Sequence, residues 1–460
     1  MADKANNQKG EASSSKDQQQ QQPAAKPKPV LDFAALAALS KLSLDNKLPA
    51  TAAATAATTV AAPAPVVAST SDGPREHKFW KTQPVPQGSD HLPTLKAGPL
   101  ETKELKNVKQ DPFKLPEGFE WHLLDWEDTN HVEEAYVLLR DNYVEDDDAM
   151  FRFDYSRDFL KWALMPPGWK KEWQIGIRNS KNGKLLAMIT ATPAMVSAAG
   201  TELPMVEINF LCAHKSLREK RLAPVLIKEV TRRVNLCNVW QAVYTAGVAI
   251  PTPIGVAKYW HRSLNPRKLI DIGFTGLHGR QTIQRLNRLM QVPEAVSTPG
   301  WRPMEEKDVP QVFALLRSYL SKFKLHISFQ EHEIAHIFLP RHEVVSSYVV
   351  EGKNGKITDF ASFYHLYSSV IRNPKHKTLR AAYSYYNAPG TLSLQDLFAN
   401  LLIEANKQQC DVFNALDLME NKPVFEPLKF GIGDGNLHYY LYNYSLGGPC
   451  DPKDIGVVLV

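Results

Sequence analysis

One stretch of the chain combines a strand-like run with a cluster of cations at the start of a helix. Residues 207–215 read Glu-Ile-Asn-Phe-Leu-Cys-Ala-His-Lys and lead into Ser-Leu-Arg-Glu-Lys-Arg-Leu-Ala-Pro at 216–224. The free backbone N–H groups of a first helical turn, together with the helix dipole, attract anions. Arg218, Lys220 and Arg221 adjoin that turn. The pattern therefore predicts a site for a cofactor that carries a pyrophosphate.

The same cations also fit a plainer interpretation, a solvated basic helix face. Basic residues continue through Lys228, Arg232 and Arg233, and basic faces without a ligand are common. The apolar residues after the turn favour a helix packed on a core. They are Leu222, Val225, Leu226, Val230 and Val234. Taken alone, the turn leaves both interpretations open.

The composition is that of a globular protein with an ordinary charge balance. The chain has 460 residues, 43% of them hydrophobic, which is enough for two domains or one two-lobed domain. A formal net charge of +5 is small for a protein that neutralises many phosphates, so we expect a small anionic ligand and no nucleic-acid site. The four cysteines form no C-x-x-C pair, which argues against a zinc cluster or a disulfide framework. With neither an apolar signal segment nor a hydrophobic run long enough for a bilayer, we expect a cytoplasmic protein without a transmembrane segment.

The first 73 residues differ in composition from the rest. They contain a glutamine run at 18–22 and an Ala/Thr/Val/Pro tract from Pro49 to Thr70. With few aromatic residues, such a segment cannot offset chain entropy by burial, so residues 1–73 are predicted to be a disordered extension. Within it, Leu31–Leu48 carries apolar residues near helical spacing. This fits a short amphipathic helix, either transient or docking onto a larger assembly such as the ribosome.

The remainder of the chain repeats its own pattern. Val132, followed by Leu-Leu-Arg at 138–140, is echoed 177 residues later by Val309, followed by Leu-Leu-Arg at 315–317. Lys-Asn-Gly-Lys at 181–184 recurs at 353–356, each time between apolar runs. Asn-Gly between two strands predicts a hairpin, because both residues tolerate positive φ. Unless the two Asn-Gly turns are coincidental, the order of helix, hairpin, strand and helix occurs twice, which predicts a mixed α/β protein with two similar halves.

The two halves differ at the turn before the last helix. The strand and helix at 207–235 correspond in order to those at 381–405, where the turn at 387–393 reads Asn-Ala-Pro-Gly-Thr-Leu-Ser and carries no cation. Only the first half is therefore expected to hold a pyrophosphate in this way. The second half is free for an acceptor substrate.

A strand, basic turn and helix after a long hairpin resembles the acyl-CoA module of the N-acetyltransferase-like superfamily. More specifically, residues 207–215, together with Lys-Phe-Gly-Ile-Gly-Asp-Gly at 429–435, resemble the two signature segments of the glycylpeptide N-myristoyltransferase family. Similar pieces also lie at Phe79–Pro86, Tyr143–Tyr155 and Tyr244–Gly247, and the likeness covers about residues 74–460.

The resemblance implies a monomeric enzyme that transfers a myristoyl group to the N-terminal glycine amine of peptides and nascent proteins. Myristoyl-CoA would be the co-substrate, with no prosthetic group and no metal. The implied fold has two N-acetyltransferase-like halves related by pseudo-twofold symmetry, with a saddle-shaped sheet flanked by helices. Residues 74–295 would bind myristoyl-CoA, and residues 296–460 would bind the peptide.

The resemblance also assigns a catalytic group. Backbone N–H groups of Phe210 and Leu211 would stabilise the oxyanion, while Asn209 and Thr245 would orient the amine. An α-amine has a pKa near 8 and is mostly protonated at neutral pH, so a base is needed. The C-terminal carboxylate of Val460 would be that base.

Two further sets of residues are implied for the substrates. The CoA side comprises His77, Lys78, Phe79, Trp80, Leu211, Cys212, Ala213, Arg218, Glu219, Lys220, Arg221, Leu222 and Ala223. The acceptor side comprises Asp146, Asp148, Phe151, Phe153, Tyr155, Tyr259, His261, Ser368, Asp434 and Gly435, with the two aspartates attracting basic residues of the peptide.

Several of these residues have structural alternatives. Phe79 and Trp80 also fit an aromatic anchor, and His261 fits a hydrogen-bonded structural histidine. Cys212 lies two residues from His214 on a strand, which would suit an acyl-enzyme nucleophile, but the resemblance implies direct attack by the amine. For the whole chain the alternatives are a catalytically silent lipid- and peptide-binding module and a short-chain acyl-CoA N-acyltransferase.

Overall fold

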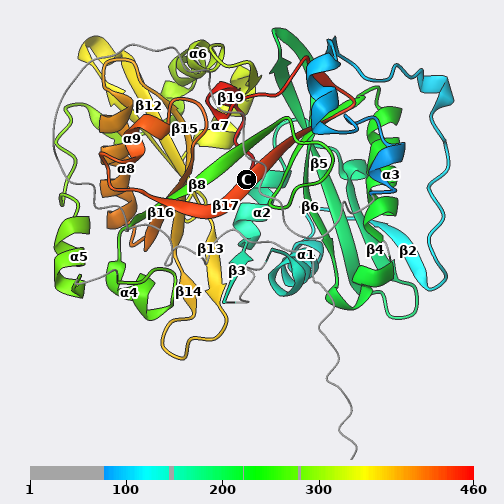
Figure 1. The fold of residues 1–460 in the computed structure, drawn as a ribbon, viewed down its shortest axis with the longest axis horizontal. Coiled ribbons are helices and arrows are strands. Elements are labelled where there is room, and N and C mark those ends of the chain that lie inside the picture. Colours follow the sequence, from blue (N-terminus) through cyan, green and yellow to red (C-terminus); the bar gives the residue numbers. More distant parts are fainter. Residues whose placement is uncertain (1–76, 145–149, 221, 278–280) are drawn as a thin grey trace, which may run out of the picture. The chain divides into compact units, whose positions relative to one another are not determined.

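The computed structural model describes residues 77–144, 150–220, 222–277 and 281–460, all within the compact unit Phe33–Val460 (Figure 1). The predicted extension 1–73 and its candidate helix Leu31–Leu48 lie outside the described residues. So do Asp146, Asp148 and Arg221. The side chains of residues 89–91 and 218–220 are also outside the description.

The first half of the fold is a mixed sheet with helices on both faces. Its elements are β2 (Phe119–Leu123), α1 (Thr129–Asn142), α2 (Arg157–Leu164), β4 (Gln174–Asn179), β5 (Leu185–Ala198), β6 (Thr201–Ala213), α3 (Leu222–Leu236) and β7 (Gln241–Ala246). Strands β2, β4, β5 and β6 pair antiparallel in that order, and β6 then pairs parallel with β7.

The second half repeats this order. Its elements are β9 (Trp301–Pro303), α6 (Val309–Leu320), α7 (Glu331–Phe338), β11 (Val345–Glu351), β12 (Ile357–His365), β15 (Ala381–Ala388), α8 (Leu394–Lys407) and β16 (Val412–Leu416). Strands β9, β11, β12 and β15 pair antiparallel, and β15 pairs parallel with β16. The repeat predicted from the two Leu-Leu-Arg helices and the two Lys-Asn-Gly-Lys turns is thus confirmed.

The two halves exchange strands where they meet. Strand β8 (Gly255–Ser263) follows the first half in the chain but pairs with β16 of the second. Strand β17 (Gly431–Tyr442) follows the second half but pairs with β7 of the first, and β17 and β8 also pair with each other. The described residues therefore form a 14-stranded sheet in which β7, β17, β8 and β16 are consecutive neighbours.

Short elements complete the description. Strands β10 (Leu325–Ile327) and β19 (Ile455–Gly456) extend the large sheet beside β5, while β3 (Phe151–Asp154), β13 (Tyr367–Val370) and β14 (Thr378–Leu379) form a small one. Strands β1 (Ala97–Gly98) and β18 (Ser445–Leu446) pair with each other. The short helices are α4 (Pro266–Asp271), α5 (Ile283–Met290) and α9 (Lys422–Phe425), with 3-10 turns at Trp80–Thr82 and Lys215–Lys220, among others.

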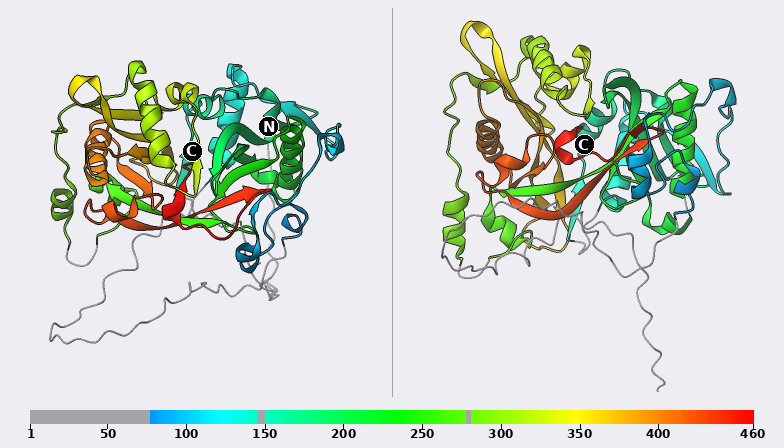
Figure 2. Two further views of the ribbon diagram at one scale, coloured as in Figure 1. Left: turned by 90° about the horizontal axis from the view of Figure 1, so that it is seen from above. Right: turned by 45° about the horizontal axis from the view of Figure 1, so that its top comes forward.

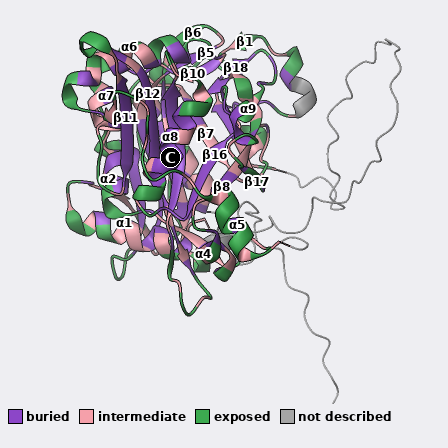
Figure 3. Cartoon of the chain, turned by 90° about the vertical axis from the view of Figure 1, so that its left-hand side faces the viewer, coloured by how far each residue is buried: buried purple, intermediate pink, exposed green. Residues whose placement is uncertain are grey.

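Burial follows the apolar pattern of each element. Helix α3 places Leu222, Leu226, Val230 and Val234 on one face of β5 and β6, while α1 packs on the other face. Helix α8 covers β12 and β15 in the same way, with α6 opposite. Figure 3 shows the consequence, with buried residues along the strands and exposed ones on the outer sides of the helices.

Side-chain caps set the starts of several helices. Asp128 accepts a hydrogen bond from the N–H of Asn130 at 2.8 Å in α1, Ser156 accepts one from Phe159 at 3.2 Å in α2, and Ser393 accepts one from Asp396 at 3.1 Å in α8. Each cap satisfies one N–H group that has no partner within its own helix.

The two Asn-Gly turns are both hairpins but differ in conformation. In the second, Asn354 (φ 66°) and Gly355 (φ 72°) both adopt positive φ, as predicted. In the first, Gly183 does so at 70°, and Asn182 is not among the positive-φ residues. Here Asn182 accepts a hydrogen bond from the N–H of Lys184 at 3.1 Å through its side chain, which stabilises the turn in a different way.

The basic residues of α3 are only partly a solvated face. Lys228 is exposed, but Arg232 and Arg233 bind the fully buried carboxylate of Glu229, each at 2.7 Å. Burial alone would raise the pKa of Glu229, yet the two arginine hydrogen bonds hold that pKa below its ordinary value. The solvated-face interpretation therefore does not hold for Arg232 and Arg233.

A membrane-spanning helix is not found among the residues described above; no helix there has the necessary length and apolar character.

The turn before α8 shows why the halves differ. Three consecutive backbone N–H groups, from Gly390, Thr391 and Leu392, donate to the buried Asp359 carboxylate at 2.7, 2.9 and 2.9 Å. An array of N–H groups at a strand-to-helix turn is an anion site, and here a carboxylate of the chain itself fills it. The second turn is thus already occupied, besides lacking cations.

We predict that Asp359→Asn lowers the free energy of unfolding by roughly 3 kcal/mol at pH 7, because a neutral amide accepts the three N–H hydrogen bonds more weakly than a carboxylate and its NH₂ group cannot accept from the Thr391 hydroxyl. The hydrogen bonds hold the pKa of Asp359 below its ordinary 3.8, although burial alone would raise it. The stabilisation is therefore complete above pH 3.8. It is lost as the pH falls through the pKa of Asp359 in the folded state, which lies below 3.8. Urea unfolding at several pH values measures both effects.

Asp451→Asn is the matched control, because Asp451 is exposed. Its substitution should change the free energy of unfolding little at any pH. The free energies of unfolding of the wild type and Asp359→Asn should approach each other in acid. If their difference stays constant, the role given to this carboxylate is wrong.

Candidate functional site

Strands β6 and β7 part in the middle of the sheet. Their parallel pairing runs from Met205–Gln241 to Glu207–Val243 and stops there, although both strands continue. Beyond this point β6 contains a bulge, since Asn209 pairs with Thr190 and Cys212 with Met188, which leaves Phe210 and Leu211 opposite Ile189 alone. Phe210 takes a positive φ of 52° at the bulge. Such bulges redirect backbone groups and often lie beside functional sites.

An apolar cavity of about 170 Å³ fills the gap between the parted strands and α3. Its lining includes Asn209, Phe210 and Leu211 of β6 and Thr245 of β7, together with Trp80. The apolar remainder comes largely from α3 and from the neighbouring strands, and includes Ile189, Val206, Ile208, Ile227, Val230, Val234 and Ala242. Four of the five predicted catalytic residues therefore surround one cavity.

The N-terminal aromatic residues close one side of this cavity. The Trp80 ring stacks on Tyr244 at 6.1 Å between centroids, and Tyr244 stacks on Tyr440 at 5.0 Å. Phe79 contacts the edge of Trp80 at 5.2 Å, while Lys78 is exposed and His77 is half-buried. The segment both anchors the entry of the chain and contributes a cavity wall, so the two interpretations of Phe79 and Trp80 are compatible.

The cationic turn takes the expected backbone form. A 3-10 turn at Lys215–Lys220 leads to α3, which begins at Leu222. Leu222 is buried and Ala223 half-buried. The side chains of Arg218, Glu219 and Lys220, and all of Arg221, lie outside the described residues, so their role as a phosphate cradle stays a prediction.

Cys212 and His214 each lie against another group. The Cys212 sulfur is buried 4.0 Å from the carbonyl oxygen of Leu138, and Nδ1 of His214 lies 2.8 Å from the hydroxyl of Ser216. Ala213, between them, ends β6. This arrangement favours packing for Cys212 over covalent catalysis.

The end of the chain lies against the bulge. The Asn209 carboxamide donates a hydrogen bond to the terminal oxygen of Val460, and its own oxygen accepts from the Phe210 N–H at 2.8 Å. Both views of Figure 2 show the C-terminus inside the described fold rather than at an outer edge. The prediction that the apolar tail is buried is confirmed for Val457 and Val458, with Leu459 and Val460 half-buried.

Two tyrosines that the sequence did not single out hold this tail. The Tyr439 hydroxyl donates to the Val457 carbonyl at 3.0 Å, and the Tyr386 hydroxyl accepts from the Val458 N–H at 3.0 Å. Both rings are buried. The signal was available in the Tyr-rich runs at 383–386 and 439–444, but it does not say which hydroxyl faces the tail.

Aromatic residues of the predicted acceptor side lie next to the bulge. Tyr155 contacts the Phe210 ring edge-on at 5.0 Å and Phe153 at 5.9 Å. Pairing of β3 with β13 places Phe153 opposite the buried Ser368, and Phe151 opposite Val370. The structure thus brings Phe151, Phe153, Tyr155 and Ser368 together.

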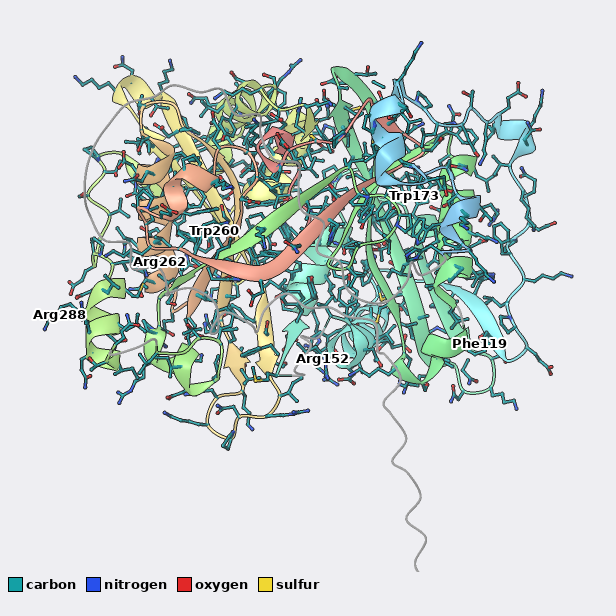
Figure 4. All side chains as sticks on the ribbon, in the orientation of Figure 1. Phe119, Arg152, Trp173, Trp260, Arg262 and Arg288 are labelled. Atoms are coloured by element: carbon teal, nitrogen blue, oxygen red, sulfur yellow. The ribbon has the colours of Figure 1, made fainter. Side chains whose placement is uncertain are left out.

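Strand β8 supplies two more acceptor-side residues. Tyr259 and His261 stack on one face of the strand at 6.5 Å. Trp260 and Arg262, labelled in Figure 4, alternate with them and pack against the α5 and α9 region, where Trp260 lies 5.2 Å from the Phe425 ring and Arg262 donates to the Met290 carbonyl. This alternation fixes which side chains of β8 face the site.

His261 is neutral and keeps one nitrogen without a partner. Its Nδ1 lies 2.7 Å from the Asn414 amide oxygen, to which it donates, and burial lowers the pKa of His261 to about 4 despite that bond. Its buried Nε2 has no hydrogen-bond partner among the described residues. An acceptor nitrogen of this kind suits an N–H or O–H donor of a ligand.

The Gly-rich segment passes close to this histidine. A Cβ at Gly433 would lie 2.5 Å from His261 Nε2 and 2.9 Å from the Tyr259 carbonyl, so a larger residue does not fit. Asp434 is exposed and Gly435 is buried in β17. The segment is therefore a strand with a close approach and not a phosphate loop. Among the residues that the structure describes, no cluster of His, Cys, Asp or Glu could hold a metal ion.

Two family models match this chain in order. The model of the myristoyl-CoA:protein N-myristoyltransferase N-terminal domain matches residues 99–257, and that of the C-terminal domain matches residues 271–458.

The chain is similar to two named relatives and one solved structure. It is 52% identical over 384 residues to glycylpeptide N-tetradecanoyltransferase 2 of Danio rerio, covering 84% of this chain and 77% of that protein. It is 51% identical over 389 residues to glycylpeptide N-tetradecanoyltransferase 1 of Arabidopsis thaliana, covering 84% and 90%. The crystal structure of the Saccharomyces cerevisiae N-myristoyltransferase with bound myristoyl-CoA superposes with a TM-score of 0.81 at 39% identity, covering 86% of this chain and 97% of that one.

We predict that Tyr439→Phe loosens the C-terminal tail, because the buried Val457 carbonyl loses its donor at a cost of about 1–3 kcal/mol. A change of one or two kcal/mol in local opening should speed the release of Val460 by carboxypeptidase roughly 5- to 30-fold. Tyr442→Phe on the same strand is the control, since its hydroxyl binds Gln83 at 3.0 Å. Equal release from both variants would show that the Tyr439 hydroxyl does not hold the tail.

Proposed function

This chain belongs to the myristoyl-CoA:protein N-myristoyltransferase family, and from that premise we propose how its site transfers a myristoyl group from myristoyl-CoA to the N-terminal glycine amine of a peptide or protein. The chain is an acyltransferase. The observation that carries the proposal is the hydrogen bond between Asn209 and the Val460 carboxylate, at the bulge that borders the apolar cavity. A base, a polar anchor and an apolar binding space meet at that point.

The acyl chain is assigned to the cavity between β6, β7 and α3. Its walls are apolar, and a fatty chain there would be removed from water at a gain of about 25 cal/mol per Å² of buried surface. The CoA group would leave the cavity along Trp80 toward the start of α3. There the N–H groups near Leu222 and Ala223 and the cations of the turn would bind its phosphates. The remaining residues assigned to CoA are His77, Lys78, Phe79, Leu211, Cys212, Ala213, Arg218, Glu219, Lys220 and Arg221.

The thioester carbonyl is assigned to the bulge. Backbone N–H groups of Phe210 and Leu211 would stabilise the developing oxyanion, an effect worth on the order of 3 kcal/mol per donor. The Phe210 N–H already donates to the Asn209 side chain. For this amide to take part, the Asn209 carboxamide must give up that bond when the thioester binds.

The amine is assigned to the space between Val460, Asn209 and Thr245. The Val460 carboxylate would accept a proton from the glycine ammonium, and the amine would then attack the thioester carbon directly. The CoA thiolate would leave and take up the second N–H proton as the amide forms. The neutral His261 would accept a hydrogen bond from the acceptor peptide. Phe151, Phe153, Tyr155, Tyr259, Ser368, Asp434 and Gly435 would line its path, with Asp146 and Asp148 beyond them.

The assignment of one substrate to each half of the chain is also a proposal, as are the location and oligomeric state of the enzyme. Residues 74–295 would bind myristoyl-CoA and residues 296–460 the peptide, with β8 and β17 crossing between them. We propose a cytoplasmic monomer, with residues 1–73 as an extension whose Leu31–Leu48 segment could contact the ribosome during synthesis of client proteins.

A transfer assay tests the activity. The purified protein is expected to convert a Gly-x-x-x-Ser peptide to its N-myristoyl form with myristoyl-CoA, as measured by mass spectrometry and thiol release. The same peptide with a blocked amine is the control and should not react. Turnover with acetyl-CoA alone would make the protein a short-chain N-acyltransferase, and binding without turnover would make it a silent lipid- and peptide-binding module.

A second experiment tests the base. Removal of Leu459 and Val460 should lower turnover by ~100-fold or more, the usual effect of a general base, while acyl-CoA affinity stays nearly unchanged. Val460→Leu is the matched control, because it keeps the main-chain carboxylate and should stay active. Equal turnover in the truncated protein would reject the carboxylate as the base.

A further inference from the structure

A buried histidine and a buried asparagine lie side by side on neighbouring strands of the candidate site. His261 of β8 and Asn414 of β16 are direct partners in the antiparallel pairing, and they are 6% and 0% exposed. His261 Nδ1 lies 2.7 Å from the Asn414 amide oxygen. Residues that oppose each other in an antiparallel pair project from the same face of the sheet. Both side chains therefore lie on the face that also carries Tyr259, two residues before His261.

The asparagine determines which ring nitrogen of His261 carries the hydrogen. An amide oxygen can only accept a hydrogen bond, so the imidazole donates to it from Nδ1. In a neutral ring with its hydrogen on Nδ1, the other nitrogen is an acceptor. That nitrogen, Nε2, is buried and has no hydrogen-bond partner among the described residues. The ring thus presents an unused acceptor to the acceptor side of the site.

The orientation of the Asn414 carboxamide follows from its other neighbour. Asn414 is the register partner of Tyr383 on β15. Its NH₂ group makes no hydrogen bond of normal geometry within the described residues, yet it lies close enough to the Tyr383 hydroxyl to offset part of the rise that burial causes in the pKa of Tyr383. A rotated carboxamide would turn its NH₂ group to Nδ1 and require the ring hydrogen on Nε2. The contact with Tyr383 therefore favours hydrogen on Nδ1.

Packing holds the His261 ring in this position. The Phe274 ring contacts it edge-on at 5.5 Å, Tyr259 stacks on it at 6.5 Å, and a Cβ at Gly433 would lie 2.5 Å from Nε2. These are contacts of shape, and they do not distinguish a ring nitrogen that carries a hydrogen from one that does not. Among the described residues, Asn414 alone makes a hydrogen bond with the ring.

The groups that contact the ring carry no charge at neutral pH. They are Tyr259, Phe274, Asn414 and Gly433. Burial raises the pKa of Tyr259, and Asp434, which follows the close-approach glycine, is exposed. Burial lowers the pKa of His261 to about 4, and the bond to the asparagine only partly offsets this. The ring is therefore neutral at physiological pH, and its tautomer alone decides what it offers to a ligand.

We propose that Asn414 is a positioning residue of the acceptor site, which fixes His261 as the tautomer with hydrogen on Nδ1 and so keeps Nε2 a hydrogen-bond acceptor for the peptide. This inference rests on the proposed function, in which His261 accepts a hydrogen bond from the acceptor peptide. Asn414 touches no substrate in this scheme and acts through His261. Without it, the ring would be free to carry its hydrogen on Nε2 and would then meet a donor of the peptide with another donor.

The first test measures the tautomer directly in the full chain. NMR of protein labelled with ¹⁵N in its histidine rings distinguishes a ring nitrogen that carries a hydrogen from a bare one, and the His261 signals are those missing from His261→Gln. Between pH 6 and 8 the wild type is expected to carry hydrogen on Nδ1 and none on Nε2. In Asn414→Leu, which keeps the size of the side chain but has no acceptor, hydrogen should appear on Nε2. Hydrogen on Nε2 in the wild type, or an unchanged tautomer in Asn414→Leu, would overturn the proposal.

The second test measures the KM of a Gly-x-x-x-Ser peptide with saturating myristoyl-CoA. Each value is divided by the wild-type value at the same pH, which removes the titration of the glycine amine from the comparison. In Asn414→Leu this ratio should be about tenfold at every pH, with kcat nearly unchanged, because the hydrogen bond from the peptide to His261 is lost. An unchanged KM would show that the tautomer of His261 does not matter to the peptide.

Asn414→Asp should give a result that a purely structural role would not produce. A carboxylate also accepts from Nδ1, but its charge raises the pKa of His261, so at low pH both ring nitrogens carry hydrogen. The KM ratio should therefore be high at low pH. It should fall toward one as the pH rises through the pKa of His261 in this variant, because Nδ1 keeps its hydrogen and Nε2 becomes bare. A ratio that matches Asn414→Leu at every pH would contradict the proposal.

Asn400→Asp is the matched control for a charge in place of a buried asparagine. Asn400 of α8 is 6% exposed, and its amide donates to the Thr298 hydroxyl at 2.9 Å. The variant should keep the wild-type tautomer of His261 and a KM ratio near one; the pH-dependent ratio of Asn414→Asp, if also found here, would count against the proposal. A wild type that transfers no myristoyl group would instead reject the proposed function, while the NMR measurement would still decide the tautomer.

Discussion

The hydrogen bond from Asn209 to the terminal oxygen of Val460 is the contact on which the site depends. It joins a strand of the first half to the last residue of the chain, 251 positions later. The bond can form only because β6 bulges at Phe210 and because the hydroxyls of Tyr386 and Tyr439 hold the tail in place. A carboxylate at a chain end has few covalent restraints, so its position must come from such contacts.

The two halves use one architecture for two purposes. In each, a strand leads through a turn into a helix, and a parallel neighbour pairs with only part of the strand. In the first half the strands part around an apolar cavity, and the turn carries cations. In the second, the turn amides are filled by Asp359, and the β15 segment beyond the pairing contacts the C-terminal tail through Tyr386. In the second half, Asp359 thus occupies the turn and the C-terminal tail occupies the space beside the strand. The corresponding turn and space in the first half stay open.

The exchange of β8 and β17 brings the halves into one site. His261 and Tyr259 arrive on β8, and the close approach at Gly433 arrives on β17, which itself pairs with Thr245 of β7 through Tyr439. Burial there keeps His261 neutral, so its free nitrogen can accept a hydrogen bond without adding charge to the candidate site. A sheet that stopped at the boundary between the halves would leave these residues apart.

The sequence by itself determined the class of fold and named four residues that border the apolar cavity. Apolar periodicity, the doubled Asn-Gly turns and the order of helices and strands follow from local preferences, so the repeat could be predicted. The two signature segments identified Asn209, Phe210 and Leu211 as a group, and the apolar tail indicated that Val457 and Val458 would be buried.

What only the tertiary structure decided were the contacts between residues far apart in the chain. Arg232 and Arg233 look like surface cations in sequence, yet the buried Glu229 pairs with both. Glu207 reads as an ordinary strand residue, yet it lines a cavity together with residues of α7 and the C-terminal tail, and burial there raises its pKa. Local patterns encode which residues are apolar or helical. The environment of a charge depends on which groups from distant parts of the chain pack against it. Local sequence patterns do not show which of those groups come close.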